Sequence, residues 1–130
     1  MSGVPRIGPE AFDGARLGRP GVWAVEFLAD WCPYCRDFAP RFEALGAMGA
    51  NLLAVDLSDL GSPLWERFGI DIVPTVLVFQ DGAIVVRADG VPMEGLGPSD
   101  LAAIRAALET RGGMAASSAG RRAPRTRDRP

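Results

Sequence analysis

The sequence contains neither histidine nor lysine, and all 14 of its basic residues are arginine. The lack of histidine excludes the side chain that most often serves as a general base or a metal ligand. No apolar run reaches the 18 or so residues of a membrane-spanning helix. The first residues also lack the basic segment and long apolar stretch of a secretory signal. We therefore expect a cytoplasmic protein, although a chain trimmed of its signal would give the same pattern.

Charge is unevenly distributed along the 130 residues. Residues 1–111 carry 9 arginines and 15 acidic residues (−6), residues 112–130 carry 5 arginines and Asp128 (+4), and the sum is the −2 of the whole chain.

Hydrophobic residues make up 48% of the sequence, enough for one domain with a buried core. We predict one domain over residues 1–111 and a flexible arginine-rich tail over residues 112–130. The tail has no aromatic residue to stack on bases, so we expect a solubilising extension and no specific nucleic-acid partner. The alternative is that its arginines bind an anionic partner, such as an acidic protein or lipid head groups.

Hydrophobic periodicity predicts alternating helices and strands. Apolar runs rich in β-forming residues predict buried strands, and apolar residues at steps of three or four predict helices. The predicted helices cover residues 9–17, 32–48, 62–69 and 97–113, the strands cover residues 22–29 and 51–57, and a hairpin covers residues 75–90. This order predicts an α/β fold with a mixed central sheet, in which parallel strands and an antiparallel C-terminal hairpin are sandwiched by helices.

The only two cysteines, Cys32 and Cys35, lie three positions apart in the stretch "ADWCPYCRDFAP". A structural disulfide here would close a very small loop and remove little entropy from the unfolded chain. A structural metal site needs about four ligands, and this chain has two thiols and no histidine. The third interpretation is a redox-active pair that exchanges electrons with another molecule.

The redox interpretation explains more of this stretch. Cys32 follows a predicted strand and begins a predicted helix, where free backbone N–H groups and the helix dipole favour a thiolate. Pro33 suits the first helical position, and Cys35 falls in the first turn and faces inward. We therefore expect Cys32 to attack a substrate disulfide and Cys35 to resolve the mixed disulfide. We also expect the two sulfurs to meet at an exposed bend.

Two segments resemble the thioredoxin family. "FLADWCPYCRDFAPRF" is similar to its active-site strand, Trp-Cys-x-x-Cys motif and proline-containing helix, and "FGIDIVPTVLVFQDGAIVVRADG" is similar to its cis-proline loop and hairpin. The resemblance covers about residues 10–110 and implies a thioredoxin fold with protein-disulfide oxidoreductase activity. It implies that Cys32 is the nucleophile and Cys35 the resolving thiol.

The resemblance also implies a substrate-binding surface. Trp31 resembles the ring beside the disulfide, and Val73 resembles the residue whose backbone pairs with an extended substrate peptide. Pro74 resembles the cis-proline that faces the cysteines, although a trans proline starting the next strand is the alternative. Gly90 resembles the glycine on the substrate-facing rim, with an ordinary turn as its alternative.

Glu26 interrupts the apolar run "VWAVEFLA", where a charge is costly unless it is neutralised or paired. The resemblance implies an acid beneath Cys35, so burial should raise its pKa and let it accept the proton of Cys35, directly or through water. The alternative is that Glu26 reaches solvent near the strand end. The family often pairs this acid with a lysine on the next strand, but the matching residues here, Ala54 and Val55, are apolar.

The dipeptide Pro33-Tyr34 between the cysteines is typical of glutaredoxins rather than thioredoxins. It should modulate the active site, and we predict a couple between roughly −200 and −270 mV. We expect protein disulfides as substrates, a reductase or small thiol as the electron donor, and a monomer with no metal or bound cofactor beyond the Cys32–Cys35 disulfide. The alternatives are a glutathione-dependent oxidoreductase, a redox-inactive peptide-binding module and an oxidase in an exported compartment.

Overall fold

A mixed five-stranded sheet organises residues 3–114, the part of the chain that the computed structural model describes. The strands lie in the order β1 (Arg6–Ile7), β5 (Leu52–Asp56), β4 (Val22–Leu28), β6 (Thr75–Gln80) and β7 (Ala83–Ala88). β1, β5 and β4 are parallel, whereas β6 and β7 form the antiparallel hairpin. The predicted mixed sheet is confirmed, with the short β1 as an additional edge strand.

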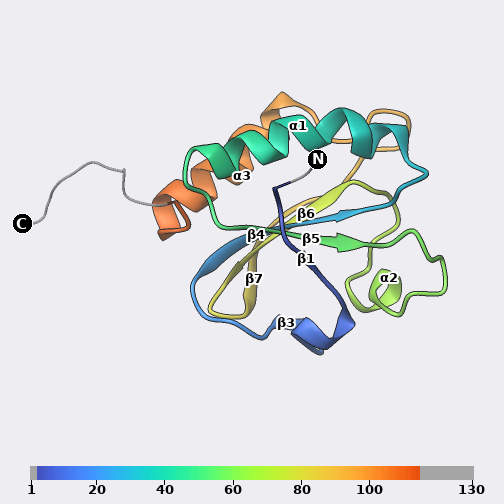
Figure 1. The fold of residues 1–130 in the computed structure, drawn as a ribbon, viewed down its shortest axis with the longest axis horizontal. Coiled ribbons are helices and arrows are strands. Elements are labelled where there is room, and N and C mark those ends of the chain that lie inside the picture. Colours follow the sequence, from blue (N-terminus) through green and yellow to red (C-terminus); the bar gives the residue numbers. More distant parts are fainter. Residues whose placement is uncertain (1–2, 115–130) are drawn as a thin grey trace, which may run out of the picture.

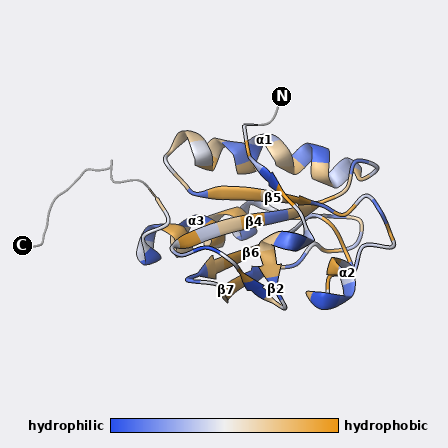
Figure 2. Ribbon diagram, turned by 60° about the horizontal axis from the view of Figure 1, so that its bottom comes forward, coloured by the Kyte–Doolittle hydropathy of each residue, from blue (hydrophilic) through white to orange (hydrophobic). Residues whose placement is uncertain are grey.

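Helices cover both faces of this sheet. Figure 1 shows α1 (Pro33–Ala47) and α3 (Pro98–Arg111) on one face and α2 (Leu64–Arg67) on the other. The two hydrophobic core clusters match these layers, since one includes Phe38 and Phe42 of α1 with Ile104 of α3, and the other includes Leu64 of α2. Figure 2 shows hydrophobic colour along β5 and β6, as expected for strands covered on both faces.

The alternation of β4 decides where Glu26 points. Val25 and Phe27 belong to the core on the α2 side, whereas Ala24 belongs to the core beneath α1 and α3. Successive side chains of a strand point to opposite faces, so Glu26 shares the face of Ala24 and points toward α1.

The predicted helix over residues 9–17 is wrong. Residues Pro9–Ala11 form one 3-10 turn, and β2 (Phe12–Asp13) pairs with β3 (Arg16–Leu17) in a small antiparallel hairpin. Gly14 adopts a φ of 60° in the connection, a left-handed conformation that ends a helix and suits a turn. The hairpin places Phe12 opposite Leu17, and both side chains are buried.

The remaining elements lie close to their predicted positions. Asp81 and Gly82 both have positive φ values, 49° and 93°, as the tight hairpin turn requires. α1 continues through Pro40, and α2 is shorter than the predicted 62–69. Within residues 3–114, no helix has the length and apolar character needed to cross a membrane.

Ordered contacts continue for a few residues past the end of α3 at Arg111. Gly112 ends α3 with a φ of 91°. Gly113 is buried and its carbonyl accepts a hydrogen bond from the N–H of Asn51, at 2.9 Å. Residues 115–130 of the predicted tail lie outside the described residues.

Candidate active site

The two thiols lie at the start of α1, just after the loop that connects β4 to this helix. Cys32 is the N-cap of α1, with extended backbone, and Pro33 occupies the first helical position. Cys35 lies in the first turn, so the helix brings its side chain back toward Cys32. Both cysteines are free thiols, and the interaction with the Cys32 side chain is one cause of the raised pKa of Cys35.

The expectation of an exposed bend is wrong for the sulfurs. Cys32 is only 5% exposed and Cys35 only 4%. The loop before Pro74 lies against the first sulfur, and the Cys32 thiol donates a hydrogen bond to the carbonyl oxygen of Val73, at 3.4 Å. Cys32 nevertheless lines a surface groove of about 330 Å³, so a partner would reach it from that groove.

Two stacked indoles form one wall of the groove. The rings of Trp31 and Trp65 lie 6.5 Å apart at an interplanar angle of 9°. Each indole N–H is anchored to a backbone carbonyl, Trp31 to Ser58 at 3.0 Å and Trp65 to Asp59 at 3.1 Å. Trp31 was predicted from the sequence as part of this surface. Trp65 was not, because no local pattern places α2 beside the cysteine loop.

The opposite wall comes from the loop before β6 and the turn after β7. Ile72 and Val73 line it, together with Val91 and Met93. Met93 is 82% exposed, a large apolar side chain presented to solvent beside the thiols. Tyr34 is half-buried, lines the same groove, and packs against Gly95, where an added Cβ would lie 2.9 Å from the Tyr34 Cβ.

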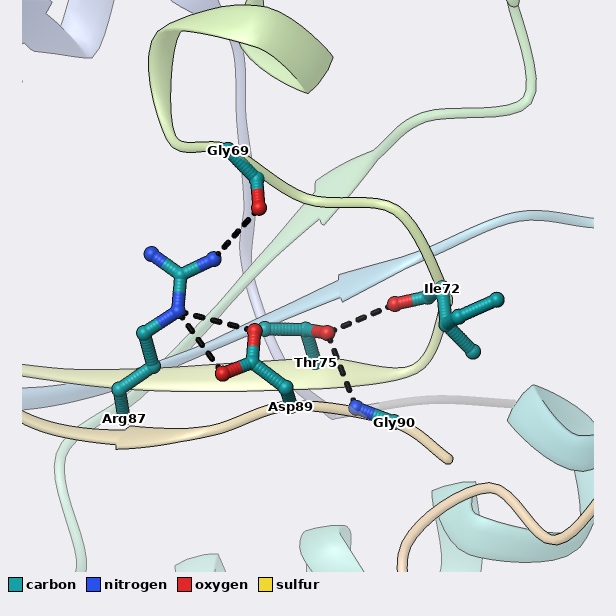
Figure 3. A network of polar contacts seen from close by, with 6 residues as sticks. All are labelled: Gly69, Ile72, Thr75, Arg87, Asp89 and Gly90. Atoms are coloured by element: carbon teal, nitrogen blue, oxygen red, sulfur yellow. Dashed lines mark hydrogen bonds and ion pairs between the residues drawn. The ribbon is translucent and has the colours of Figure 1, made fainter. Parts of the chain in front are cut away.

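A polar network holds the Pro74 loop in place (Figure 3). The Val73–Pro74 peptide bond is cis. The hydroxyl of Thr75 donates to the carbonyl of Ile72 at 2.7 Å and accepts from the N–H of Gly90 at 3.2 Å. Next to it, Arg87 forms an ion pair with Asp89 and donates to the carbonyl of Gly69, at 2.9 Å in both cases.

Gly90 is fixed in this network by close packing. A Cβ at this position would lie 2.5 Å from the carbonyl oxygen of Pro74 and 3.0 Å from Ile72 Cγ2. Close packing against the Pro74 loop therefore requires glycine at position 90, which an ordinary turn would not. Its assignment to a substrate-facing rim stays a prediction.

Beneath Cys35 lies a cavity of about 200 Å³ that contains the predicted acid. Glu26 is only 3% exposed, so the alternative that it reaches solvent is wrong. Its Oε2 atom has no hydrogen-bond partner among the described residues. Burial, followed by repulsion from Glu43, raises the pKa of Glu26 to about 8, while the positive charge of Arg6 lowers it.

Cys35 is a weaker acid than an ordinary thiol. Burial raises the pKa of Cys35 strongly, a backbone hydrogen bond at Ala29 opposes this, and Cys32 and Glu26 raise the pKa further. A thiol in this state needs a nearby base before it can attack. Three carboxyl groups line the same cavity, and they are Glu26, Asp30 and Glu43.

Two further residues line the cavity with Glu26 and Cys35 and were not predicted from the sequence, namely Arg6 and Glu43. Glu43 carries a weak signal, because it lies two helical turns after Cys35. Arg6 carries none, because its position depends on the pairing of a two-residue strand. Within residues 3–114, no group of three or more potential metal-binding side chains comes together.

Comparisons with known proteins agree with this geometry. A family model described as Thioredoxin matches residues 6–97. Human protein disulfide-isomerase A6 is 34% identical over 94 residues, covering 67% of this chain and 21% of that protein. The thioredoxin of Chlamydia muridarum is 36% identical over 73 residues, covering 55% of this chain and 71% of that protein. The chain therefore spans about a fifth of the disulfide isomerase that it matches.

Solved structures give the same fold. Thioredoxin f from spinach chloroplast, in its short form, superposes with a TM-score of 0.66 at 19% identity, covering 82% of this chain and 93% of that one. A mutant thioredoxin from Halobacterium salinarum gives a TM-score of 0.61 at 25% identity, covering 85% and 94%. The predicted thioredoxin fold is confirmed.

Proposed function

Because this chain belongs to the thioredoxin family, we propose that it is a protein thiol–disulfide oxidoreductase that acts through Cys32 and Cys35. The observation that carries the proposal is the contact between two free thiols at the start of α1, with Cys32 lining an apolar groove. A groove with two stacked indoles suits an extended peptide with apolar side chains beside its disulfide.

The proposed reaction has two exchange steps. The Cys32 thiolate attacks one sulfur of a substrate disulfide, a bond forms between them, and the other substrate sulfur leaves with the electron pair as a thiolate. Cys35 then gives its proton to Glu26 and attacks Cys32. The Cys32–Cys35 bond forms, the mixed disulfide breaks, and the second substrate sulfur leaves as a thiolate. The substrate disulfide is reduced and the cysteine pair is oxidised.

We further propose that a reductase or a small thiol returns two electrons to the Cys32–Cys35 disulfide. The groove would hold the substrate through Trp31, Val73, Pro74 and the rim near Gly90, and Pro33 and Tyr34 would modulate the couple. We propose that the protein works as a monomer in the cytoplasm with no metal.

Reduction of insulin disulfides with dithiothreitol as donor tests the activity. We expect turnover by the full chain, none by Cys32→Ser, and accumulation of mixed disulfides by Cys35→Ser, because resolution needs the second thiol. Turnover by Cys32→Ser would contradict the assigned roles. Absence of turnover in the intact dithiol protein would favour a peptide-binding module, and activity with glutathione alone would favour the glutaredoxin-like alternative.

Substitution of Trp65 tests the proposed groove. Trp65→Ala removes the stacking partner of Trp31, so we expect KM for a protein disulfide to rise about fivefold, a loss of about 1 kcal/mol of binding. The rate with a small aromatic disulfide should change little. Trp23→Ala is the matched control, because Trp23 packs under Arg19 near the opposite end of β4. Equal effects of the two substitutions would contradict a role of Trp65 in the groove.

A further inference from the structure

A row of three residues crosses the sheet beneath α1. In the strand register, Arg6 of β1 pairs with Ala54 of β5, and Ala54 pairs with Glu26 of β4. Residues paired in this way in a parallel sheet project to the same face. The central residue has only a methyl group, and all three residues line the cavity under Cys35. The strand next to the buried acid has no lysine, but an arginine one strand further out faces the same cavity.

A second row runs along α1 on the other side of the cavity. Cys35, Ala39 and Glu43 lie four residues apart, so they share one face of the helix, and all three line the cavity. The middle residue is again alanine. The small side chains of Ala54 on the sheet and Ala39 on the helix thus leave space between Glu26 and Arg6 on one side and Cys35 and Glu43 on the other.

Glu43 is one of the residues of this cavity that reach solvent. It is half-buried, and it also lines a neighbouring surface hollow with three exposed residues, Gly3, Pro5 and Gly46. Glu26, in contrast, is buried, with one carboxyl oxygen lacking a partner among the described residues. The cavity volume of about 200 Å³ exceeds the roughly 30 Å³ that one water occupies in the liquid, and polar groups at both ends can bind water.

The charges around the cavity couple Glu26 electrostatically to Glu43 and to Arg6. Glu43 destabilises the ionised form of Glu26 and Arg6 stabilises it. Arg6 is held by Asp56, with 3.5 Å between its Nη1 and the carboxylate Oδ2. Asp30 and Arg36 complete the charged groups, and Arg36 donates to the backbone carbonyl of Asp30 at 3.1 Å.

We propose that Glu43 is the outer group of a two-carboxyl proton path, in which the proton that Glu26 accepts from Cys35 crosses the cavity to Glu43 and leaves to solvent, with Arg6 as counter-charge. The inference rests on the proposed function. Water in the cavity carries the proton, no electrons move in this step, and Glu26 returns to its carboxylate form. Glu43 and Arg6 act through Glu26 and are positioning residues.

Single-turnover kinetics with 5,5′-dithiobis(2-nitrobenzoate) isolate the step concerned. The reduced full chain releases one thionitrobenzoate when Cys32 attacks and a second when Cys35 resolves the mixed disulfide. The second phase is unimolecular and requires loss of the Cys35 proton. Its rate is measured from about pH 6 to about pH 9, across the titration of Glu26.

For Glu43→Gln we expect two changes in the second phase. The midpoint of the pH profile shifts to lower pH, because a like charge near Glu26 is removed. The plateau rate falls about tenfold, because the outer proton acceptor is lost. Glu43→Asp should restore most of the plateau, as should a small buffer base that enters the hollow. Arg6→Met should shift the midpoint to higher pH.

The matched control is Glu66→Gln, the same change at an exposed residue of α2 on the opposite face of the sheet. NMR titration of the Glu26 carboxyl in each variant reports the electrostatic contact without reference to turnover. A plateau unchanged in Glu43→Gln, with or without a shifted midpoint, would overturn the proton path while leaving the proposed function intact. If the wild-type chain releases no thionitrobenzoate at all, the proposed function fails and the path fails with it.

Discussion

Replacement of Glu26 by glutamine should make this protein markedly more stable in mild alkali. Glu26 titrates at about pH 8 in the folded chain and near 4.5 in an unfolded one, because burial penalises its charged form. The folded state therefore binds one more proton than the unfolded state between these values. Its contribution to stability is present below about pH 4.5 and is lost as the pH rises toward about 8. Glutamine carries no proton to lose.

The size of the effect follows from linkage. Between about pH 5 and pH 8, the wild-type free energy of unfolding should fall by roughly 3 kcal/mol because of Glu26 alone. In Glu26→Gln this fall should disappear, so the gap between variant and wild type should widen by the same amount. The pH range stops near 8 because free thiols begin to ionise above it.

Denaturant unfolding of the reduced proteins, followed by tryptophan fluorescence, measures this difference at the two pH values. The pH dependence of the gap is a better readout than either stability alone, because the glutamine amide also needs hydrogen-bond partners in the cavity. Glu66→Gln serves as the control and should change stability by less than about 0.5 kcal/mol at both pH values. A wild-type stability that stays level over this range would contradict a buried, neutral Glu26.

The parts of the site that could be predicted from the sequence depend on local spacing. Cys32 and Cys35 meet because they lie three positions apart at the start of α1. Glu26 is buried because it lies in a nearly continuous apolar strand that is covered on both faces. The exposure of the cysteines could not be predicted, because the covering loop before Pro74 arrives from 40 residues further along the chain. The position of Arg6 could not be predicted either, because a strand of two residues gives no periodicity from which to predict its pairing.

The fold shows the same division. Predicted strands and long helices were confirmed where many residues share one pattern, as in β4 and α1. The predicted helix over residues 9–17 was wrong because two apolar residues, Phe12 and Leu17, are too few to distinguish a helical face from a hairpin pair. Asp13-Gly14 was the available turn signal, and a glycine with positive φ allowed the chain to reverse there.

Gly90→Ala is expected to damage both stability and activity. The added methyl group would lie 2.5 Å from the Pro74 carbonyl oxygen, closer than real Cβ contacts allow, and that neighbour is backbone. The Thr75 hydroxyl ties Gly90 to the Pro74 loop through two hydrogen bonds, so the strain cannot be relieved by moving one side chain (Figure 3). Overpacking of this kind costs about 1–3 kcal/mol.

The loss of activity should exceed what the lost stability explains. The displaced loop carries the Val73 carbonyl that contacts the Cys32 thiol at 3.4 Å, and it forms one wall of the groove. A shift of about 1 Å between reacting groups can reduce a rate about 100-fold. We therefore expect insulin reduction by Gly90→Ala to fall at least about tenfold under conditions where the variant is fully folded.

Gly3→Ala provides the matched control, because an added Cβ at that glycine meets no atom within 4 Å. Both variants are compared by denaturant unfolding and by insulin reduction, at a temperature well below the unfolding transition of the weaker one. A Gly90→Ala protein that is destabilised yet retains wild-type turnover would mean that Gly90 serves the packing of the loop but not the geometry of the reacting sulfur. Retention of both properties would mean that the loop can move away from the thiols at little cost, and that its contact with Cys32 does not position the nucleophile.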